Sequence, residues 1–326
     1  MSEDAAEAVS NNMGNNINNN NNNNVRVAVL LSSYNGARYI EEQMTSILQQ
    51  RGVAVQLIVR DDGSTDDTCA IVQRMAGQYP NITLIAGTNL GVVGSFFLLL
   101  SNAPPACQFY ALADQDDVWY PDKLSRAVTM LMAHDQQAVA VYCSALENVD
   151  QHLAHLSYSE RYSKERIGLK NALVQNIATG CTMVLTPAAR ELIITELPQR
   201  CIIHDWWIYI VISALGTVLY DPEPTMQYRQ HGGNVIGAPR SGWDHLKRRF
   251  RALLDTTAVK RSEQLQEFDR IFGARLAPDQ REQVRRLAFY QRSLSSWLAA
   301  AFSSGFRRHR LTEELLVRLV VLMGKF

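Results

Sequence analysis

The sequence predicts an α/β protein with a parallel-rich, doubly wound sheet and a helical C-terminal region. Short apolar, β-branched runs alternate with stretches of helical apolar spacing from residue 25 to about residue 145. Such alternation implies right-handed βαβ units. Polar residues directly follow several of the apolar runs, and beyond about residue 237 the pattern changes to basic amphipathic helix.

Each expected strand is an apolar run that ends at a turn signal. The first run stops at Tyr34-Asn35-Gly36 and the second at Asp61-Asp62-Gly63. Strands are expected at residues 25–32, 53–59, 82–85, 109–113 and 139–144. Because the carboxyl ends of parallel strands open into one crevice, we expect the polar residues that follow them to meet there.

Each expected helix has apolar residues three or four positions apart. Ile40, Met44 and Ile47 illustrate this spacing, and Asp66 and Asp67 favour the positive N-terminal end of the second helix. Helices are expected at residues 37–50, 65–79, 94–101 and 123–133, with a further apolar helix beginning at residue 204. In the C-terminal region they are expected at residues 243–254, 262–273, 280–302 and 311–323.

The bulk composition limits the protein class. Of 326 residues 47% are apolar, so a large core is expected, and 32 Lys or Arg balance 32 Asp or Glu, which argues against a nucleic-acid partner. Five scattered cysteines without a C-x-x-C pair argue against disulfides or a thiolate zinc site and fit a reducing cytoplasm. No stretch reads as a signal peptide or a transmembrane helix. We expect a cytoplasmic protein, either free or peripheral on the inner face of the membrane.

Three regions are expected along the chain. Residues 1–24 form an asparagine-rich leader that we expect to be disordered, because it cannot bury apolar area to offset its ordering entropy. Residues 25–237 form the α/β domain. Residues 238–326 form a basic amphipathic helical region, in which residues 241–326 carry 17 Lys or Arg against 9 Asp or Glu.

The sharpest chemical signal is Asp114-Gln115-Asp116-Asp117, which follows an apolar strand. Three carboxylates in four residues repel one another unless a cation lies among them. Mg²⁺ and Mn²⁺ prefer such oxygen ligands together with substrate phosphates, and they assist the departure of a diphosphate. The alternative is an acidic surface turn that caps a helix.

Two further strand ends suit a nucleotide. Asp62, with Asp61 close behind, is expected to accept the imide N–H of uracil or thymine, although the same segment also reads as a helix cap. Ser33, Tyr34 and Asn35 would wrap the base from the other side. Asn89 and Gly91 lie in a glycine-containing turn that could approach the donor phosphates. The alternative is that the glycines serve packing.

Two later segments complete the candidate site. At the start of the apolar helix Asp205 is a candidate general base, or else a helix cap. Trp206 and Trp207 offer flat faces to an acceptor sugar, although core packing explains them equally well. Arg229 is a candidate diphosphate contact and His231 a candidate ligand of the metal or of a phosphate oxygen.

Together these segments resemble the family 2 glycosyltransferases of the GT-A fold, which bind nucleotide-diphospho-sugars on a Rossmann-like mixed sheet. The matching stretches are VAVLLSSYNGARYIEEQMTSILQQ, LIVRDDGSTDDT, NLGVVGSFF, YALADQDDVWYPDKL, IHDWW and YRQHGGN, which lie between residue 25 and about residue 237. The forms DQDDVW-P-KL and HDWW are similar to those of bacterial rhamnosyltransferase-like members that act in cell-surface polysaccharide assembly.

The resemblance implies an inverting transfer from a nucleotide-diphosphate sugar, with dTDP-rhamnose the best candidate donor, to a glycan or lipid-linked acceptor. It implies Mg²⁺ or Mn²⁺ at Asp114-x-Asp116, with Asp116 the strongest ligand candidate, and Asp205 as the general base. Many relatives have an acid before that base, where this chain has His204. The Q-x-x-R-W motif of processive synthases is absent, so one sugar per encounter is expected.

Other readings stay open. A catalytically idle module that binds nucleotide-sugars or glycans would keep the base contacts without needing Asp205. A dinucleotide-dependent oxidoreductase is disfavoured, since residues 32–38 read SSYNGAR rather than G-x-G-x-x-G. The helix expected at 311–323, preceded by Arg307, Arg308 and Arg310, suits an anionic bilayer surface, a cap on the catalytic domain or a dimer contact.

Overall fold

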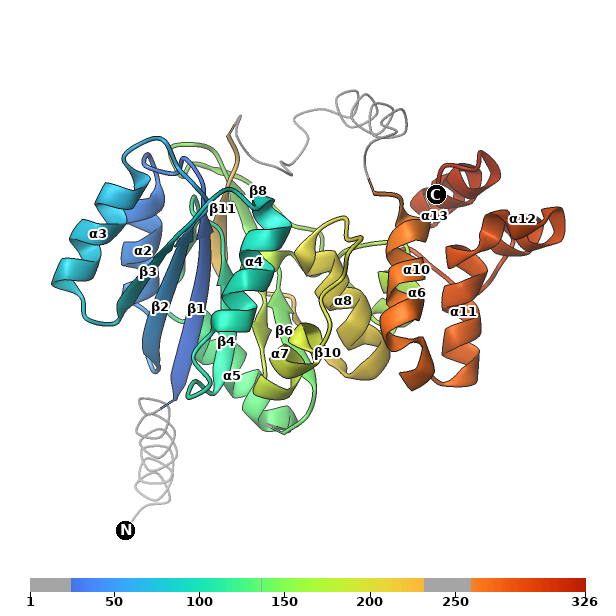
Figure 1. Cartoon of the computed structure of the whole chain (residues 1–326), viewed down its shortest axis with the longest axis horizontal. Helices are drawn as coiled ribbons and strands as arrows, with labels where there is room; N and C mark the ends of the chain where they lie inside the picture. Colours follow the sequence, from blue (N-terminus) through green and yellow to red (C-terminus); the bar gives the residue numbers. More distant parts are fainter. Residues whose placement is uncertain (1–24, 136, 232–258) are drawn as a thin grey trace, which may run out of the picture.

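The computed structural model describes residues 25–135, 137–231 and 259–326. The predicted leader at residues 1–24, the predicted boundary between residues 237 and 238 and the predicted helix at 243–254 lie outside the described residues. In the described part a twisted sheet carries helices on both faces, and further helices pack at one end (Figure 1).

The main sheet has seven strands in the order β10-β6-β9-β4-β1-β2-β3. Its strands, in chain order, are β1 (Arg26–Ser33), β2 (Ala54–Asp61), β3 (Ile82–Ala86), β4 (Phe109–Ala113), β6 (Ala140–Ser144), β9 (Val184–Leu185) and β10 (Thr217–Asp221). Strand β9 runs antiparallel to both β4 and β6, whereas the remaining pairs are parallel. The sheet is therefore mixed. The chain leaves β1 toward β2 and returns to its other side at β4, which places a ligand crevice at the carboxyl ends of β1 and β4.

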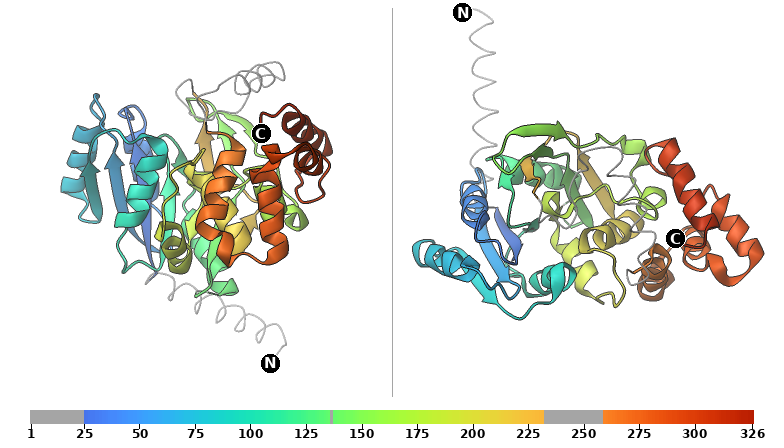
Figure 2. Two further views of the ribbon diagram at one scale, coloured as in Figure 1. Left: turned by 45° about the vertical axis from the view of Figure 1, so that its right-hand side comes forward. Right: turned by 90° about the horizontal axis from the view of Figure 1, so that it is seen from above.

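The two faces of the sheet have separate apolar cores. In β1, Val27, Val29 and Leu31 point into one core, and Ala28 and Leu30 point into the other. The first core is closed by α2 (Ile40–Leu48), α3 (Thr68–Gln78) and α5 (Lys123–His134). The second is closed by α4 (Gly91–Asn102), α7 (Pro187–Ile194) and α8 (His204–Leu215). Figure 2 shows these layers from two further directions.

A second, smaller sheet lies near the carboxyl ends of the main strands (Figure 1). Its strand order is β5-β11-β7-β8, formed by β5 (Val118–Trp119), β11 (Met226–Arg229), β7 (Glu147–Val149) and β8 (His155–Tyr158). β11 pairs parallel with β7 and antiparallel with β5. This sheet joins the acidic loop after β4 to segments more than a hundred residues further along the chain.

The nine elements predicted before residue 145 are all present, with ends within three residues of those expected. The apolar helix at residue 204 is also confirmed. The short strands β5, β7, β8, β9 and β10 were not expected; each has only two to five residues, too few for a periodic pattern to stand out.

The C-terminal helices are α10 (Arg261–Phe272), α11 (Pro278–Ala288), α12 (Leu294–Ala301) and α13 (Leu311–Leu322). They continue the second core, because the Trp207 ring of α8 packs against Phe268 and Phe272 of α10. No helix in the described ranges is long and apolar enough to cross a membrane.

The single helix predicted at residues 280–302 is wrong. The chain forms α11 and α12 there, separated by a 3-10 turn at Tyr290–Arg292. Ser293 starts the second helix, since its Oγ accepts a hydrogen bond from the backbone N–H of Ser296 at 3.1 Å. Apolar periodicity runs through this break, so spacing alone did not reveal it.

Candidate active site

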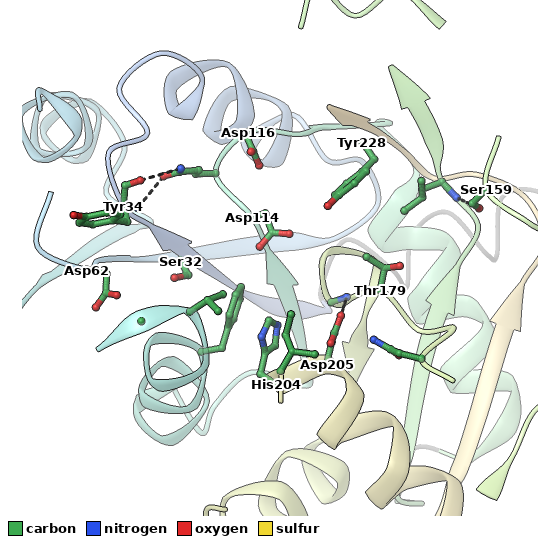
Figure 3. A pocket seen from close by; sticks show the side chains of 18 of the residues that line it. Ser32, Tyr34, Asp62, Asp114, Asp116, Ser159, Thr179, His204, Asp205 and Tyr228 are labelled. Atoms are coloured by element: carbon green, nitrogen blue, oxygen red, sulfur yellow. Dashed lines mark hydrogen bonds between the residues drawn. The ribbon is translucent and has the colours of Figure 1, made fainter. Parts of the chain in front are cut away.

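A pocket of about 590 Å³ opens where the carboxyl ends of β1 and β4 face the second sheet (Figure 3). Eight of the fifteen predicted site residues line this pocket: Tyr34, Asp62, Asn89, Gly91, Asp114, Gln115, Asp116 and Asp205. Seven do not: Ser33, Asn35, Asp61, Trp206, Trp207, Arg229 and His231. The strand-end acids Asp62, Asp114 and Asp116 thus share one cavity with the candidate base.

Gln115 fixes the loop that carries Tyr34. The Gln115 Oε1 accepts hydrogen bonds from the Tyr34 backbone N–H and the Ser33 hydroxyl, both at 2.9 Å, and Gln115 Nε2 donates to the Tyr34 carbonyl at 3.1 Å. A Cβ atom at Gly36 would lie 2.1 Å from Gln115 Oε1, so a side chain at residue 36 would displace the Gln115 amide from these bonds. Ser33 therefore supports the loop, and Tyr34, 48% exposed, is the residue it presents to the pocket.

Asn35 also acts on the loop and not in the pocket. Its φ of 49° lies in the left-handed region that asparagine tolerates. The Asn35 Oδ1 accepts a hydrogen bond from the Thr65 N–H at 2.8 Å, and the Asn35 N–H donates to Ser64 Oγ at 2.8 Å. The ends of β1 and β2 are tied together by these bonds.

The paired acids at the end of β2 have different positions. Asp61 Oδ2 accepts hydrogen bonds from the N–H groups of Gly63 and Ser64 at 3.1 and 2.9 Å, so Asp61 shapes the turn. Asp62 lines the pocket, and its Oδ1 accepts from the Leu90 N–H at 2.7 Å and from the Arg60 guanidinium. Of the two predicted base contacts, the structure brings only Asp62 to the cavity.

The start of α4 borders the pocket beside Asp62. Asn89 Oδ1 accepts a hydrogen bond from the Gly91 N–H at 3.0 Å, and Gly91 has a φ of 71°. Both residues line the cavity at the N-terminus of a twelve-residue helix. Unpaired N–H groups at such an end favour an anion.

The acidic loop after β4 provides a candidate metal site. One ligand atom each of Asp114, Asp117 and Cys181 lie within 4.8 Å of one another. Burial, followed by the charge of Asp116, raises the pKa of Asp114 to about 7, and burial also raises the pKa of Asp117. Asp117 Oδ2 is buried without a hydrogen-bond partner among the described residues. The carboxylate oxygens fit a hard divalent cation, whereas the cysteine sulfur does not.

Lys123 lies beneath this loop and is fully buried. Its ammonium group donates to the Cys181 carbonyl at 2.7 Å and lies 4.4 Å from the centre of the Trp119 ring. Burial lowers the pKa of Lys123 to about 8, and the charges of Asp117 and Asp114 oppose that shift. Lys123 is therefore an internal countercharge for part of the acidic cluster.

Arg229 does not line the pocket, so it is not positioned to contact a diphosphate bound there. Its side chain is buried: the guanidinium reaches Glu42 at 2.5 Å, and Nε donates to the Asp116 carbonyl at 2.8 Å. Its backbone N–H donates to Asp117 Oδ1 at 3.2 Å. We therefore correct its assignment: Arg229 holds the acidic loop in place. His231 Nε2 lies 2.7 Å from Asp116 Oδ2, so this imidazole contacts the same acidic loop.

Asp205, at the start of α8, is a buried carboxylate at the pocket wall. Its Oδ2 accepts a hydrogen bond from the Gly180 N–H at 3.0 Å, and its Oδ1 accepts from the Trp206 N–H at 2.6 Å. Burial raises the pKa of Asp205 to about 6, although these hydrogen bonds act in the opposite direction. A carboxylate with this pKa is ionised at neutral pH yet basic enough to accept a proton.

The two tryptophans after Asp205 do not reach the pocket. Trp207 is fully buried against α10, and Trp206 donates its indole N–H to the Ala172 carbonyl at 2.7 Å. An acceptor sugar therefore has no access to either ring as the structure stands, and we withdraw both from the acceptor site.

The far side of the pocket consists of residues that sequence reasoning missed. They come from the small sheet and from the segment before β9: Leu146, Asn148, Ser159, Asn176, Thr179, Gly180 and Tyr228. The remaining missed residues lie near β1, α4 and α8: Ser32, Val92, Phe96, Ile203 and His204. Most of the far-side residues lie away from the predicted strand ends and all are uncharged, so no local pattern singled them out.

The fold is of the GT-A type, and comparison with known proteins gives the family. Residues 28–193, about half of the chain, match the family model for glycosyl transferase family 2. The chain therefore belongs to glycosyl transferase family 2.

Individual relatives agree with this membership. A dTDP-rhamnosyl transferase of Shigella flexneri is 30% identical over 225 residues, which cover 64% of this chain and 74% of that protein. An uncharacterized glycosyltransferase of Nostoc sp. is 26% identical over 276 residues, 82% of this chain and 84% of that protein. Among solved structures, S. aureus TarS (residues 1–349, in complex with UDP-GlcNAc) superposes with a TM-score of 0.56 at 16% identity and covers 93% of this chain and 82% of that one. That likeness concerns the fold alone.

Proposed function

We propose that this chain transfers one sugar residue from a nucleotide-diphosphate donor to a hydroxyl group of a glycan or lipid-linked acceptor. The supporting observation is that Asp62, Asp114, Asp116 and Asp205 line one pocket. The residues that we propose for the nucleotide contact, for the metal and for the base therefore share one cavity.

The donor we propose is dTDP-rhamnose, and the pathway is bacterial cell-surface polysaccharide synthesis. Support comes from the Shigella flexneri relative, whose name gives it dTDP-rhamnosyl transfer, and from the DQDDVW and HDWW motifs. On the nucleotide side Asp62 would accept the imide N–H of thymine while Tyr34 covers the base. Asn89 and Gly91 would approach the phosphates.

The proposed chemistry is a single displacement that inverts the anomeric carbon. The acceptor hydroxyl oxygen forms a bond to that carbon, the bond from the carbon to the phosphate oxygen breaks, and the nucleoside diphosphate leaves with the electron pair. Asp205 takes the proton of the attacking hydroxyl. Asp114, Asp116 and Asp117 would hold Mg²⁺ or Mn²⁺, which when bound would neutralise charge on the diphosphate.

The acceptor site that we propose replaces the two tryptophans by the far side of the pocket. Asn148, Ser159, Asn176 and Thr179 line this side and provide amide and hydroxyl groups, and Tyr228 adds an aromatic ring. Neutral hydrogen-bonding groups beside an aromatic face suit an uncharged, hydroxyl-rich acceptor. Asp205 lies between this side and the donor side.

A catalytically idle binding module is the alternative. It would need the nucleotide side of the pocket but no buried carboxylate at the wall between the two sides. Asp205 instead occupies that position, and its burial raises its pKa to about 6, which supports a transferase. Absence of turnover with every donor tested would favour the module.

We also propose that α12 and α13 dock on an anionic membrane surface. Nine of the sixteen large apolar side chains exposed among the described residues lie between residues 294 and 323. Arg292, Arg307 and Lys325 are exposed beside them. Apolar groups rimmed by cations suit an anionic bilayer. The region is anchored near the proposed acceptor side, because Arg310 pairs at 2.8 Å with Glu160, the neighbour in sequence of the pocket residue Ser159.

The decisive test is Asp116→Ala, compared with Asp122→Ala as a control at an exposed acid outside the pocket. With Mn²⁺ present, Asp116→Ala is expected to lower the transfer rate by about a hundredfold or more, because a metal at the diphosphate supplies several kcal/mol of charge stabilisation. The control is expected to retain the wild-type rate. Calorimetric titration with Mn²⁺ should show weaker binding only for Asp116→Ala. Unchanged transfer and Mn²⁺ binding would contradict the metal site.

A further inference from the structure

His204, the first residue of α8, is a buried polar side chain that the chemistry proposed above does not use. It is 3% exposed, and its ring stacks on Phe96 with the centroids 3.9 Å apart and the planes 21° apart. Neither ring nitrogen has a hydrogen-bond partner among the described residues. Buried polar groups almost always have a hydrogen-bond partner, so these two nitrogens are candidates for a bond to a bound ligand.

The ring belongs to the pocket wall. His204 lines the cavity beside Asp205, and Figure 3 shows the ring directed toward the space below Asp114. A Cβ atom at Gly180 would lie 2.8 Å from His204 Nε2 and 3.3 Å from the Asp205 Cβ. The glycine therefore keeps the space between His204 and Asp205 clear of side chains.

His204 has apolar residues on one side and the proposed base Asp205 on the other. Val92, Phe96 and Ile203 line the same part of the pocket. The donor's anomeric carbon must lie within reach of the hydroxyl that Asp205 deprotonates. The transferred sugar would therefore lie against this wall, next to the imidazole.

The imidazole of His204 is neutral, which suits an uncharged binding partner. Burial lowers its pKa to about 3, so the imidazole is neutral at physiological pH. A neutral imidazole offers one N–H donor and one acceptor nitrogen, and a sugar hydroxyl both donates and accepts. A diphosphate only accepts hydrogen bonds and would be held better by a cation.

We propose that His204 is a specificity-determining residue that hydrogen-bonds a hydroxyl group of the transferred sugar, while C–H groups of that sugar pack on Val92, Phe96 and Ile203. This inference rests on the proposed transfer from a nucleotide-sugar. It adds that His204, the residue before the proposed base Asp205, recognises the sugar and not the nucleotide.

The test compares nucleotide and nucleotide-sugar binding in wild type and His204→Phe by calorimetry with Mn²⁺. The pairs are dTDP with dTDP-rhamnose and UDP with UDP-GlcNAc, and the pair that the wild type binds more tightly is used. Phenylalanine keeps the stacking on Phe96 but removes both nitrogens. We expect the Kd of the nucleotide to stay within about twofold and the Kd of the nucleotide-sugar to rise about tenfold, the usual effect of one lost hydrogen bond.

Two further variants separate this role from a structural one. His204→Gln restores a donor and an acceptor and should recover part of the sugar affinity; it also serves if His204→Phe does not fold. Tyr34→Ala should weaken nucleotide and nucleotide-sugar by the same factor. Equal effects of His204→Phe on both ligands, or none on either, would overturn the inference and leave the proposed function standing. A wild-type chain that binds neither pair would overturn both.

Discussion

At the scale of single residues, the environment of Asp205 determines how the protein should respond to pH. The side chain is buried, and the loss of water raises its pKa to about 6, against the pull of the Gly180 and Trp206 N–H groups. A base acts only when ionised. We therefore predict that kcat/KM rises with pH through about 6 and is level above it, measured with saturating Mn²⁺.

Replacing Asp205 tests this role. We predict that Asp205→Asn lowers kcat by about a hundredfold or more while the Kd of the nucleotide-sugar changes little. Glu191→Gln, at an exposed acid on α7, is the control and should keep the full rate. If Asp205→Asn transferred sugar at the wild-type rate, the base would have to be another residue.

The same raised pKa has a consequence for stability. The folded protein binds the Asp205 proton more tightly than the unfolded chain does, so the contribution of this group is fully favourable below pH 3.8 and is lost as pH rises through 6. We predict that the stability of the wild type relative to Asp205→Asn falls as pH rises from 4.5 to 7.5, by on the order of 2 kcal/mol. The comparison uses the pH dependence because Asn offers one acceptor oxygen where Asp205 offers two to the Gly180 and Trp206 N–H groups. Urea titrations at both pH values measure the difference, and a constant difference would contradict the raised pKa.

At the scale of elements, α12 and α13 carry the largest concentration of exposed apolar side chains among the described residues. Leu311, Leu315, Leu319 and Leu322 recur at three- and four-residue intervals along α13, and each is at least 41% exposed. Val317 and Val321 on the other face are buried. Two adjacent apolar faces, one packed and one exposed, indicate a surface that meets a partner.

We predict that the chain cosediments with anionic phosphatidylserine vesicles and that the bound fraction falls as salt is raised. Leu315→Glu should weaken binding by about tenfold, since a leucine that leaves the bilayer forfeits its burial. Thr312→Glu adds the same charge at an exposed polar position of α13 and should have a smaller effect. Equal recovery with and without vesicles at low salt, or dimers in sedimentation velocity, would favour a cap or dimer contact instead.

Longer helices and strands were predicted from the sequence more accurately than short ones. Strands β1, β2, β3, β4 and β6 are apolar runs of at least five residues that end in turn signals, so each was placed correctly. Strand β9 has two residues, and only pairing with β4 and β6 makes it a strand. The break between α11 and α12 depends on a local Ser293 cap that apolar spacing does not register.

At the scale of the whole molecule, the two sides of the pocket differed in how well the sequence predicted them. The donor side is made by residues that directly follow long strands, so Tyr34, Asp62 and Asp116 were found. The acceptor side depends on the small sheet, in which residues far apart in sequence pair, and no local pattern marks it. Arg229 and Trp207 look like ligand contacts in sequence, but tertiary packing buries both.

The donor side also predicts which nucleotides stabilise the fold. A ligand that binds only the folded protein stabilises it by an amount that grows with the logarithm of the ligand concentration divided by Kd, and so raises its melting temperature. We predict that dTDP- and UDP-sugars raise Tm in the presence of Mn²⁺ and less without it. The reason is that the Asp62 carboxylate presents acceptors to an imide N–H, in a pocket edged by Tyr34.

Two variants make this panel specific. Asp62→Asn keeps an oxygen for the Leu90 N–H, yet replaces one acceptor by a donor, so the dTDP- and UDP-sugar shifts should shrink, with about a tenfold rise in Kd. Asp67→Asn changes an exposed acid five residues away and should leave every shift unchanged. If Asp62→Asn left the dTDP- and UDP-sugar shifts unchanged, Asp62 would not contact the base. The nucleotide would then have to be recognised through its phosphates alone.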